Sequence, residues 1–279
     1  MTSSVWVNGS LVASEEPHLS AFDHGVLVGD GVFETLGVYG GLPFAWTRHH
    51  ARLRRSAEGL GLAVPESGAL RQAAGTVLAA NGIVDGRLRI TVTGGPSPLG
   101  SERGDGPPTV IVAAAPARPR RDEEAVVTVP WPRNERGATA GLKTVSYAEN
   151  VRALALAHER GATEAVFANT RGELCEATGS NVFVAVDGVV CTPPPAAGCL
   201  LGVTRALVLE LGPSAGVPVE ERTLPLEALA ASDEAFLTSS TREVVAIAAV
   251  DETRLVAPGP HTGTLARAFS ELVASNLDP

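Results

Sequence analysis

A proline- and arginine-rich stretch near the middle of the chain constrains the fold more than any other feature. Residues 115–124 read Ala-Pro-Ala-Arg-Pro-Arg-Arg-Asp-Glu-Glu. Proline fixes a backbone angle and lacks an N–H donor, so a charged, proline-rich stretch is typical of a linker rather than of a helix or strand. We therefore expect two domains: a small one over residues 1–117, a linker over 118–122 and a larger one over 123–279.

The composition bounds the class of protein. A chain of 279 residues with 44% hydrophobic residues can bury two cores. The net charge of −9 argues against a nucleic-acid partner. No stretch reaches the roughly 18 apolar residues of a membrane span, and the first residues lack the pattern of a secretory signal, so we expect no membrane partner and a cytoplasmic location. The three cysteines form no CxxC pair, which predicts reduced thiols and no metal site.

Alternation and helical spacing predict the elements of both halves. The first half is expected to contain a hairpin around Asn8-Gly9, a second hairpin from 32–36 and 38–41, helices over 48–60 and 70–80, and strands over 87–93 and 109–114. The second half is expected to contain strands over 125–130, 164–168, 174–176, 181–186, 189–192 and 235–238, with helices over 149–160 and 206–211. This mixture predicts an α+β fold in both halves.

Lys143 is the only lysine, although the chain has 22 basic residues. Arginine replaces lysine at most solvated positions, but a guanidinium cannot act as an amine nucleophile. A lysine can lose its proton when it is desolvated, form a Schiff base and move protons. The single lysine is therefore the first candidate for a catalytic group. The alternative at this point is an ordinary surface lysine.

Four other segments carry groups suited to an anionic ligand. Glu176 precedes a turn of small residues and an apolar strand, and Gly202-Val203-Thr204-Arg205 opens a helix whose free N–H groups could bind phosphate. Arg52 and Arg55 share a helix face, and Ser239-Ser240-Thr241 follows an apolar strand. Each segment also has an ordinary explanation as a turn carboxylate, a helix cap, a solvated basic face or a polar turn.

Taken in order, these segments resemble the class IV (fold-type IV) pyridoxal-phosphate enzymes. The motifs are His-x-x-Arg-Leu-x-x-Ser-Ala from residue 49, Leu-Lys from 142, Glu-x-x-x-Ser-Asn-Val-Phe from 176, Gly-Val-Thr-Arg from 202 and Thr-Ser-Ser-Thr-x-Glu-Val from 238. The resemblance covers nearly the whole chain. It implies an α+β, two-domain enzyme, with a small N-terminal α/β domain and a larger C-terminal domain that has a mixed β-barrel-like core.

The resemblance also implies the cofactor, pyridoxal 5'-phosphate, and roles for individual residues. Lys143 matches the lysine that forms the Schiff base and then shuttles the proton, and Glu176 matches the carboxylate facing the pyridine nitrogen. The other matching positions contact the phosphate or the ring of the cofactor: Arg52, Leu200, Val203, Thr204 and Ser240. Homodimers are typical of the family, so residues 20–35 and 95–105 are expected to act across the subunit interface.

Within the family we expect a transaminase that moves an amino group from a D-amino acid, or also an (R)-primary amine, to a 2-oxo acid. The segment 29–34, Gly-Asp-Gly-Val-Phe-Glu, resembles the D-amino-acid enzymes. Alternatives are a 4-amino-4-deoxychorismate lyase, a branched-chain transaminase and a non-catalytic binding protein. A serine hydrolase is disfavoured because GxSxG is absent.

One segment departs from the D-amino-acid pattern. Those enzymes carry an arginine for the substrate carboxylate directly after the Val-Thr strand end, whereas this chain has Gly94-Gly95. Arg103 or His24 is expected to replace it. The remaining residues expected near the substrate are Phe33, Tyr147 and Thr241.

Overall fold

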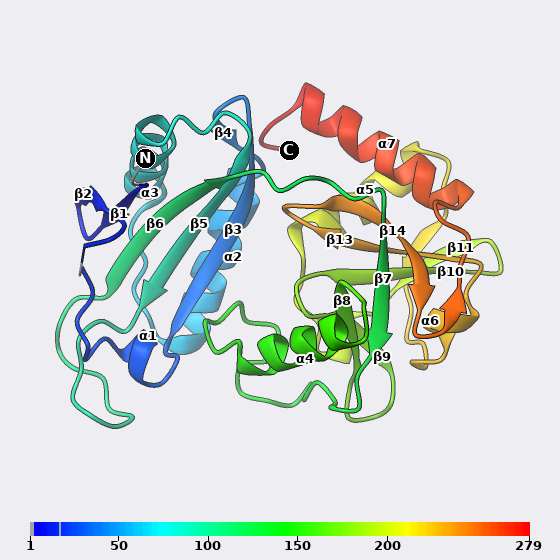
Figure 1. The fold of residues 1–279 in the computed structure, drawn as a ribbon, viewed down its shortest axis with the longest axis horizontal. Coiled ribbons are helices and arrows are strands. Elements are labelled where there is room, and N and C mark those ends of the chain that lie inside the picture. The colour runs from blue at the N-terminus through cyan, green and yellow to red at the C-terminus, as the bar shows by residue number, and fades with distance from the viewer. Residues whose placement is uncertain (1–2, 17) are drawn as a thin grey trace. The chain divides into compact units, whose positions relative to one another are not determined.

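The computed structural model describes residues 3–16 and 18–279, which form two compact units (Figure 1). Unit 1 contains the chain up to Arg118, and it also contains Leu142–Tyr147 and Leu277–Pro279. Unit 2 contains Pro119–Gly141 and Ala148–Asn276. The short segment that carries Lys143 therefore belongs to unit 1, although it lies well beyond the linker in the sequence. In the described part of the chain, no helix is long and apolar enough to cross a membrane.

Unit 1 is an antiparallel sheet packed against helices. The six strands lie in the order β2 (Ser10–Ala13), β1 (Ser4–Val7), β6 (Thr109–Pro116), β5 (Gly86–Thr93), β3 (Gly31–Tyr39) and β4 (Leu42–Pro43). The helices are α1 (His24–Leu27), α2 (Trp46–Leu60) and α3 (Ser67–Ala80). One core joins apolar side chains of β3, β5 and β6 to those of α2 and α3. Alternating residues of the strands supply this core, as a sheet covered on one face requires.

The second hairpin expected from the sequence is present, but 32–36 and 38–41 are not its two strands, because β3 pairs with β4. Residues 31–39 form one continuous strand, β3, which pairs with β5 from Gly31↔Thr93 to Val38↔Gly86. Gly37 looks like a turn residue in the sequence, but in the structure it pairs with Arg87 within this ladder. The turn comes later, at Gly40 and Gly41, which both have positive φ angles that glycine adopts without strain.

Unit 2 is built on a mixed nine-stranded sheet. The strands lie in the order β12 (Val219–Glu221), β11 (Val189–Thr192), β10 (Asn181–Val186), β13 (Glu234–Ser239), β14 (Glu243–Val250), β7 (Glu123–Thr128), β8 (Glu164–Ala168) and β9 (Leu174–Ala177), with β15 (Thr253–Arg254) paired to β14. Strands β9 and β10 are far apart in this order and yet are in contact. The sheet is therefore curled, in agreement with the mixed, barrel-like core that the resemblance implies.

Helices pack on this curled sheet. They are α4 (Ala148–Glu159), the short η1 (Pro195–Ala197), α5 (Val203–Ser214), α6 (Ala228–Ala231) and α7 (Pro260–Ser275). Helix α4 packs on β8, and α5 and α7 pack on each other and on β13. The sequence patterns predict no helix or strand after Thr241, whereas the structure has β14 and α7 there. The apolar run of β14 fits either a strand or a buried helix, and pairing with β13 and β7 decides it.

Candidate active site

The backbone of Lys143 is held between a strand and a helix of unit 1. The Phe33 N–H of β3 donates to the Lys143 carbonyl oxygen at 3.0 Å, and the Lys143 N–H donates to Ser56 Oγ of α2 at 3.0 Å. Val32 and Thr144 form an antiparallel bridge in the same segment. The lysine thus occupies a loop whose two flanking backbone groups are fixed by regular structure. A precise starting point for a long, flexible side chain is what a catalytic amine needs.

Two aromatic rings surround the amine of Lys143. Its Nζ lies 4.4 Å from the centroid of the Phe33 ring and 5.9 Å from that of Tyr147. The two rings meet edge to face, with centroids 5.2 Å apart. Phe33 and Tyr147, both expected near the substrate, are therefore brought next to the lysine.

Arg89 completes this group, and the sequence reasoning missed it. The guanidinium carbon of Arg89 lies 3.7 Å from the centroid of the Phe33 ring, and Nε donates to Thr91 Oγ1 at 3.1 Å. Arg89 lies in β5 opposite Thr35 of β3, two residues along β5 from the partner of Phe33. A signal was available: the alternation of β5 puts Arg89 and Thr91 on the face away from the core. The alternation alone does not place Arg89 next to Phe33; that also requires the pairing of β5 with β3.

Arg52 lies in a buried ionic cluster with Glu34 and His49. Its Nε and Nη2 donate to the two oxygens of Glu34, each at 2.7 Å, and His49 Nδ1 lies 2.6 Å from Glu34 Oε2. Burial alone would raise the pKa of Glu34, but the charge of Arg52 and the hydrogen bonds from Arg52 and His49 lower it well below its usual range. Burial lowers the pKa of His49. Glu34 therefore pairs with His49 Nδ1 and accepts two hydrogen bonds from Arg52, and the carboxylate fixes the plane of the Arg52 guanidinium.

Arg103 and His24, the two residues expected to bind the substrate carboxylate, both contact Asp30. Arg103 donates through Nε and Nη2 to the two oxygens of Asp30, each at 2.6 Å, and through Nη1 to the Gly61 carbonyl. His24 Nδ1 lies 2.8 Å from the same Asp30. The hydrogen bond from Arg103 holds the pKa of Asp30 below its usual value, and the bond to Asp30 raises the pKa of His24. Within this chain, both cations are thus engaged with an internal carboxylate.

The Gly94-Gly95 turn has no room for the arginine that the D-amino-acid pattern carries there. A Cβ atom at residue 94 would lie 2.5 Å from Asp30 Oδ2, and one at residue 95 would lie 2.2 Å from the Pro107 carbonyl oxygen. Gly95 also has a φ of +72°, which favours glycine. At position 94, where that pattern carries the arginine, the Asp30 side chain occupies the space, and at position 95 the obstacle is backbone.

Glu176 is held by two groups of unit 2. Its Oε2 accepts a hydrogen bond from the Leu200 N–H at 2.8 Å, and its Oε1 lies 3.5 Å from Arg133 Nε. Arg133 in turn donates to Asn150 Oδ1 at 3.0 Å and stacks over the Phe167 ring at 4.3 Å. Arg133, which the sequence reasoning missed, places a positive charge beside this carboxylate. The loop residue Leu200, assigned to the cofactor ring, is thereby tied to Glu176.

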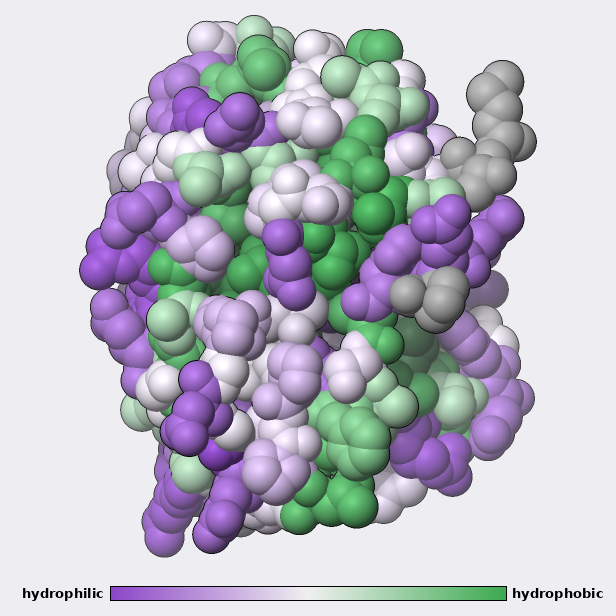
Figure 2. Space-filling view, turned by 90° about the vertical axis from the view of Figure 1, so that its left-hand side faces the viewer, coloured by the Kyte–Doolittle hydropathy of each residue, from purple (hydrophilic) through white to green (hydrophobic). Residues whose placement is uncertain are grey.

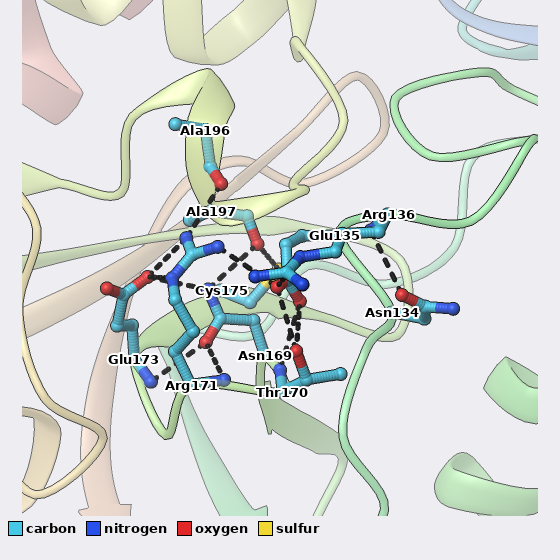
Figure 3. A network of polar contacts seen from close by, with 10 residues as sticks. All are labelled: Asn134, Glu135, Arg136, Asn169, Thr170, Arg171, Glu173, Cys175, Ala196 and Ala197. Atoms are coloured by element: carbon cyan, nitrogen blue, oxygen red, sulfur yellow. Dashed lines mark hydrogen bonds and ion pairs between the residues drawn. The ribbon is translucent and has the colours of Figure 1, made fainter.

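A polar network supports the loop that leads to Leu200 (Figure 3). Arg171 donates to Glu135 at 3.0 Å, to Glu173 and to the Ala196 carbonyl at 2.9 Å. The Thr170 hydroxyl and N–H also donate to Glu135, and together with the charge of Arg171 they lower the pKa of Glu135 to about 2. The network joins the loop before Lys143 to the strand of Glu176 and to η1. It therefore fixes the segment immediately before Leu200.

Buried thiols contribute to the same support. The Cys175 thiol donates to the Ala197 carbonyl at 3.2 Å, and burial raises the pKa of Cys175. Burial also raises the pKa of Cys199 to about 12. Both thiols therefore stay protonated near neutral pH and serve as hydrogen-bond donors, as expected for reduced cysteines. All three cysteines are free, and no group of side chains within residues 3–16 and 18–279 is placed to hold a metal ion.

The start of α5 has the shape of an anion site. Gly202 precedes the helix in an extended conformation, and no side chain caps this end. A Cβ at Gly202 would lie 2.0 Å from Asn181 Oδ1, so only glycine fits there. Asn181 also donates to the Leu200 carbonyl at 2.7 Å. Val203 and Thr204 form the first turn, whose N–H groups and positive dipole end favour a phosphate.

Ser240 lies in the turn between β13 and β14. Thr238 of β13 pairs with Asn181 of β10, which brings this turn next to the strand that starts after Glu176. Arg242 ties the turn to its surroundings, because its N–H donates to Ser239 Oγ at 3.3 Å and its guanidinium binds Ser180 and Glu164. Thr241, expected near the substrate, is exposed at the tip of the same turn.

The expected residues thus form two groups, one in each unit. Unit 1 brings together Lys143, Phe33, Tyr147 and Arg89, above the cluster that contains Arg52. Unit 2 brings together Glu176, Leu200 and the start of α5. These groups suit a phosphorylated pyridine. They comprise an amine, a carboxylate held next to a cation, a glycine-only helix start and a buried arginine.

Comparison with known proteins agrees with this chemistry. The family model of amino-transferase class IV matches residues 31–250. A putative branched-chain-amino-acid aminotransferase of Methanocaldococcus jannaschii is 33% identical and covers 88% of both chains. The D-alanine aminotransferase of Bacillus licheniformis is 32% identical over 97% of both. The aminodeoxychorismate lyase of Bacillus subtilis is 31% identical over 89% of this chain and 87% of its own.

A solved structure shows the same fold. The branched-chain aminotransferase of the archaeon Thermoproteus uzoniensis, crystallised with norvaline, superposes with a TM-score of 0.90 at 30% identity, covering 98% of this chain and 95% of its own. The relatives carry three different activities, so they establish the family and leave the substrate open. The chain belongs to the class IV aminotransferases, a family of pyridoxal-phosphate enzymes.

Proposed function

We propose that this enzyme is a transaminase that moves an amino group from a D-amino acid to a 2-oxo acid. The observation that carries the proposal is the placement of Arg89 and Lys143 against the same Phe33 ring. A cation and the candidate catalytic amine that contact one ring suit substrates that carry a carboxylate as well as an amine. The D-amino-acid assignment rests on the Gly-Asp-Gly-Val-Phe-Glu segment and on the D-alanine aminotransferase relative, which aligns over 97% of both chains.

Pyridoxal phosphate supplies an electron sink that stabilises the carbanion formed when the substrate loses its Cα proton. Lys143 would hold the cofactor through Nζ, and the same amine would take up the proton that leaves the substrate Cα. Phe33 and Tyr147 limit access of water to Nζ. Glu176 would hold a proton on the pyridine nitrogen through a charge-assisted hydrogen bond, and Arg133 lies beside this carboxylate, with Nε 3.5 Å from Oε1.

The phosphate contacts orient the ring against the amine. In this proposal Arg52, the N–H groups of Val203 and Thr204, the Thr204 hydroxyl and Ser240 bind the phosphate, and Leu200 packs on the ring. Glu34 and His49 hold Arg52 in one orientation. Fixing the ring makes proton transfer to and from Lys143 effectively intramolecular, which lowers the barrier.

Arg89 is expected to bind the carboxylate that the missing arginine binds in D-amino-acid enzymes. Arg89→Leu should raise KM for the amino acid and the 2-oxo acid by about 10- to 100-fold, the usual worth of a hydrogen bond between charged groups. Turnover of a simple (R)-primary amine in the first half-reaction should change little. Steady-state kinetics with both kinds of donor measure the difference. Arg87→Leu is the matched control, since Arg87 faces the same side of β5 two residues away; an equal effect there would contradict the role.

A donor panel tests the function itself. D-alanine, L-leucine and an (R)-primary amine are each mixed with the holoenzyme in the absence of an acceptor. Conversion of the bound cofactor to its aminated form by D-alanine, with slower or no conversion by L-leucine, supports the proposal. Preference for L-leucine favours the branched-chain activity suggested by the Methanocaldococcus relative. Release of pyruvate from aminodeoxychorismate without cofactor amination favours the lyase activity of the Bacillus subtilis relative.

We further propose that the enzyme works as a homodimer. Unit 1 exposes large apolar side chains in two segments that are far apart in the sequence and are joined by backbone hydrogen bonds. These side chains are Leu19, Phe22, Val26, Val28 and Leu99. Figure 2, which views the molecule from the left-hand side of Figure 1, shows apolar side chains gathered across that face. Contiguous exposed apolar surface is typical of an interface. The mass of the holoenzyme in solution, measured by light scattering, checks the subunit number.

A further inference from the structure

The segment Leu277–Pro279 binds the start of helix α2. The chain leaves unit 2 after α7, and residues 277–279 belong to unit 1. The Ala45 N–H donates to the Leu277 carbonyl at 2.7 Å. The N–H and the hydroxyl of Thr47 donate to the two oxygens of Asp278, each at 2.8 Å. We call this segment the α2 clasp.

Helix α2 has no cap of its own. Ala45, the residue before the helix, has a left-handed backbone with φ of 52°, and no side chain of the first turn accepts its free N–H groups. The Asp278 carboxylate supplies both the missing acceptor and a negative charge at the positive end of the helix dipole. Arg48 Nε donates to the Pro279 carbonyl at 2.8 Å, and Arg71 lies 3.3 Å from Asp278. The clasp therefore replaces a local cap with one from more than 200 residues away.

The capped helix carries three groups of the candidate site. His49 and Arg52 reach Glu34 from one face, and Ser56 binds the backbone of Lys143. All three lie within about two and a half turns of the cap, because a helix turns once in about 3.6 residues. A helix start that frays would therefore loosen His49 first and Arg52 next, while the Ser56 contact lies deepest in the helix.

We propose that Asp278 is a positioning residue: by capping α2 it holds Arg52 where it binds the phosphate of the cofactor. The proposal rests on the phosphate role of Arg52 proposed above. It predicts that removing the Asp278 carboxylate weakens the binding of ligands that carry the phosphate and of no others. Binding of pyridoxal, which forms the same bond to Lys143 but carries no phosphate, should not depend on the clasp.

The test compares pyridoxal 5'-phosphate and pyridoxal as ligands of the full chain after removal of its cofactor, by titration of the visible absorbance. In Asp278→Ala the Kd for pyridoxal 5'-phosphate should rise about fivefold, the usual effect of losing a helix cap, with the Kd for pyridoxal unchanged. Asp278→Asn, which keeps an acceptor, should fall between Asp278→Ala and the native enzyme. Thr47→Val, which removes one donor to Asp278, is a second and milder variant.

Asp85→Ala is the matched control, because Asp85 is another aspartate of unit 1 that accepts a backbone N–H, from Gly40 at 3.1 Å. It should leave both Kd values unchanged. An equal loss of both ligands in Asp278→Ala, or no loss of either, would overturn the proposal.

Arg52→Gln, measured in parallel, separates the two layers of the argument. If Arg52→Gln weakens pyridoxal 5'-phosphate selectively and Asp278→Ala does not, the clasp role is wrong while the phosphate role of Arg52 stands. If Arg52→Gln leaves the ratio of the two Kd values unchanged, the phosphate role of Arg52 is wrong, and the clasp role that depends on it is overturned as well.

Discussion

Lys143→Arg is expected to abolish transamination, with a loss of kcat of at least about 1,000-fold. A guanidinium keeps the positive charge but can neither bond covalently to the cofactor nor give up its proton at a usable pH. General acid–base transfer alone contributes about 100- to 10,000-fold. The variant should bind the cofactor without the visible absorbance of the lysine-bound form, and borohydride should fail to fix the cofactor to the protein.

The control for this prediction is built into the choice of residue. The ring of Phe33 already contacts one guanidinium, that of Arg89. Lys143→Arg keeps the positive charge of the position and removes only the reactive amine. The melting temperature and the circular dichroism spectrum should therefore stay close to native. Substantial turnover of any substrate by the Lys143→Arg enzyme would contradict the proposed mechanism.

Glu176→Gln should lower kcat by about 100-fold, within the range found when one group that stabilises developing charge is removed. Glutamine can still accept the hydrogen bond from the Leu200 N–H, so the loop geometry should survive. An uncharged amide cannot hold a proton on the pyridine nitrogen, and electron withdrawal by the ring should weaken. Half-reaction kinetics with a saturating amino donor measure the loss separately from substrate affinity.

Glu173→Gln is the matched control for Glu176→Gln. Glu173 lies three residues earlier, and hydrogen bonds from Arg171 and Asn169 hold its pKa below its usual range. It belongs to the supporting network (Figure 3) and not to the group around Leu200 N–H. Glu173→Gln should therefore lower the melting temperature and leave kcat nearly unchanged. A kcat for Glu176→Gln no lower than that of Glu173→Gln would argue against the pyridine role.

Local pattern was sufficient for the strands of unit 2 that are joined by short turns. Strands β8, β10 and β11 have the bounds expected from the sequence. Asp187 and Gly188 both adopt positive φ, as a two-residue hairpin turn requires, and they fix the pairing of Val186 with Val189. The same reasoning predicted two strands where β3 is one continuous strand, because Gly37 was interpreted as a turn residue. Its pairing with Arg87 becomes clear only when the partner strand β5 is known.

The order of short motifs in the sequence was enough to indicate the family, and the family model confirms it. The uniqueness of Lys143 was likewise visible from composition alone. These features are local: each depends on residue type and on spacing of a few positions. The expected roles of Glu176, Arg52 and the α5 start came from the same source and await the experiments above.

Only the tertiary structure shows which groups the candidate cations contact. The sequence favoured Arg103 and His24 for the carboxylate, but both bind Asp30. Arg89 reaches Phe33 because β3 and β5 pair in one register, and Asp278 reaches α2 because the chain returns to unit 1 after α7. Such contacts join residues tens to hundreds of positions apart. Side-chain direction and strand register set them, and neither is encoded within any short window of sequence.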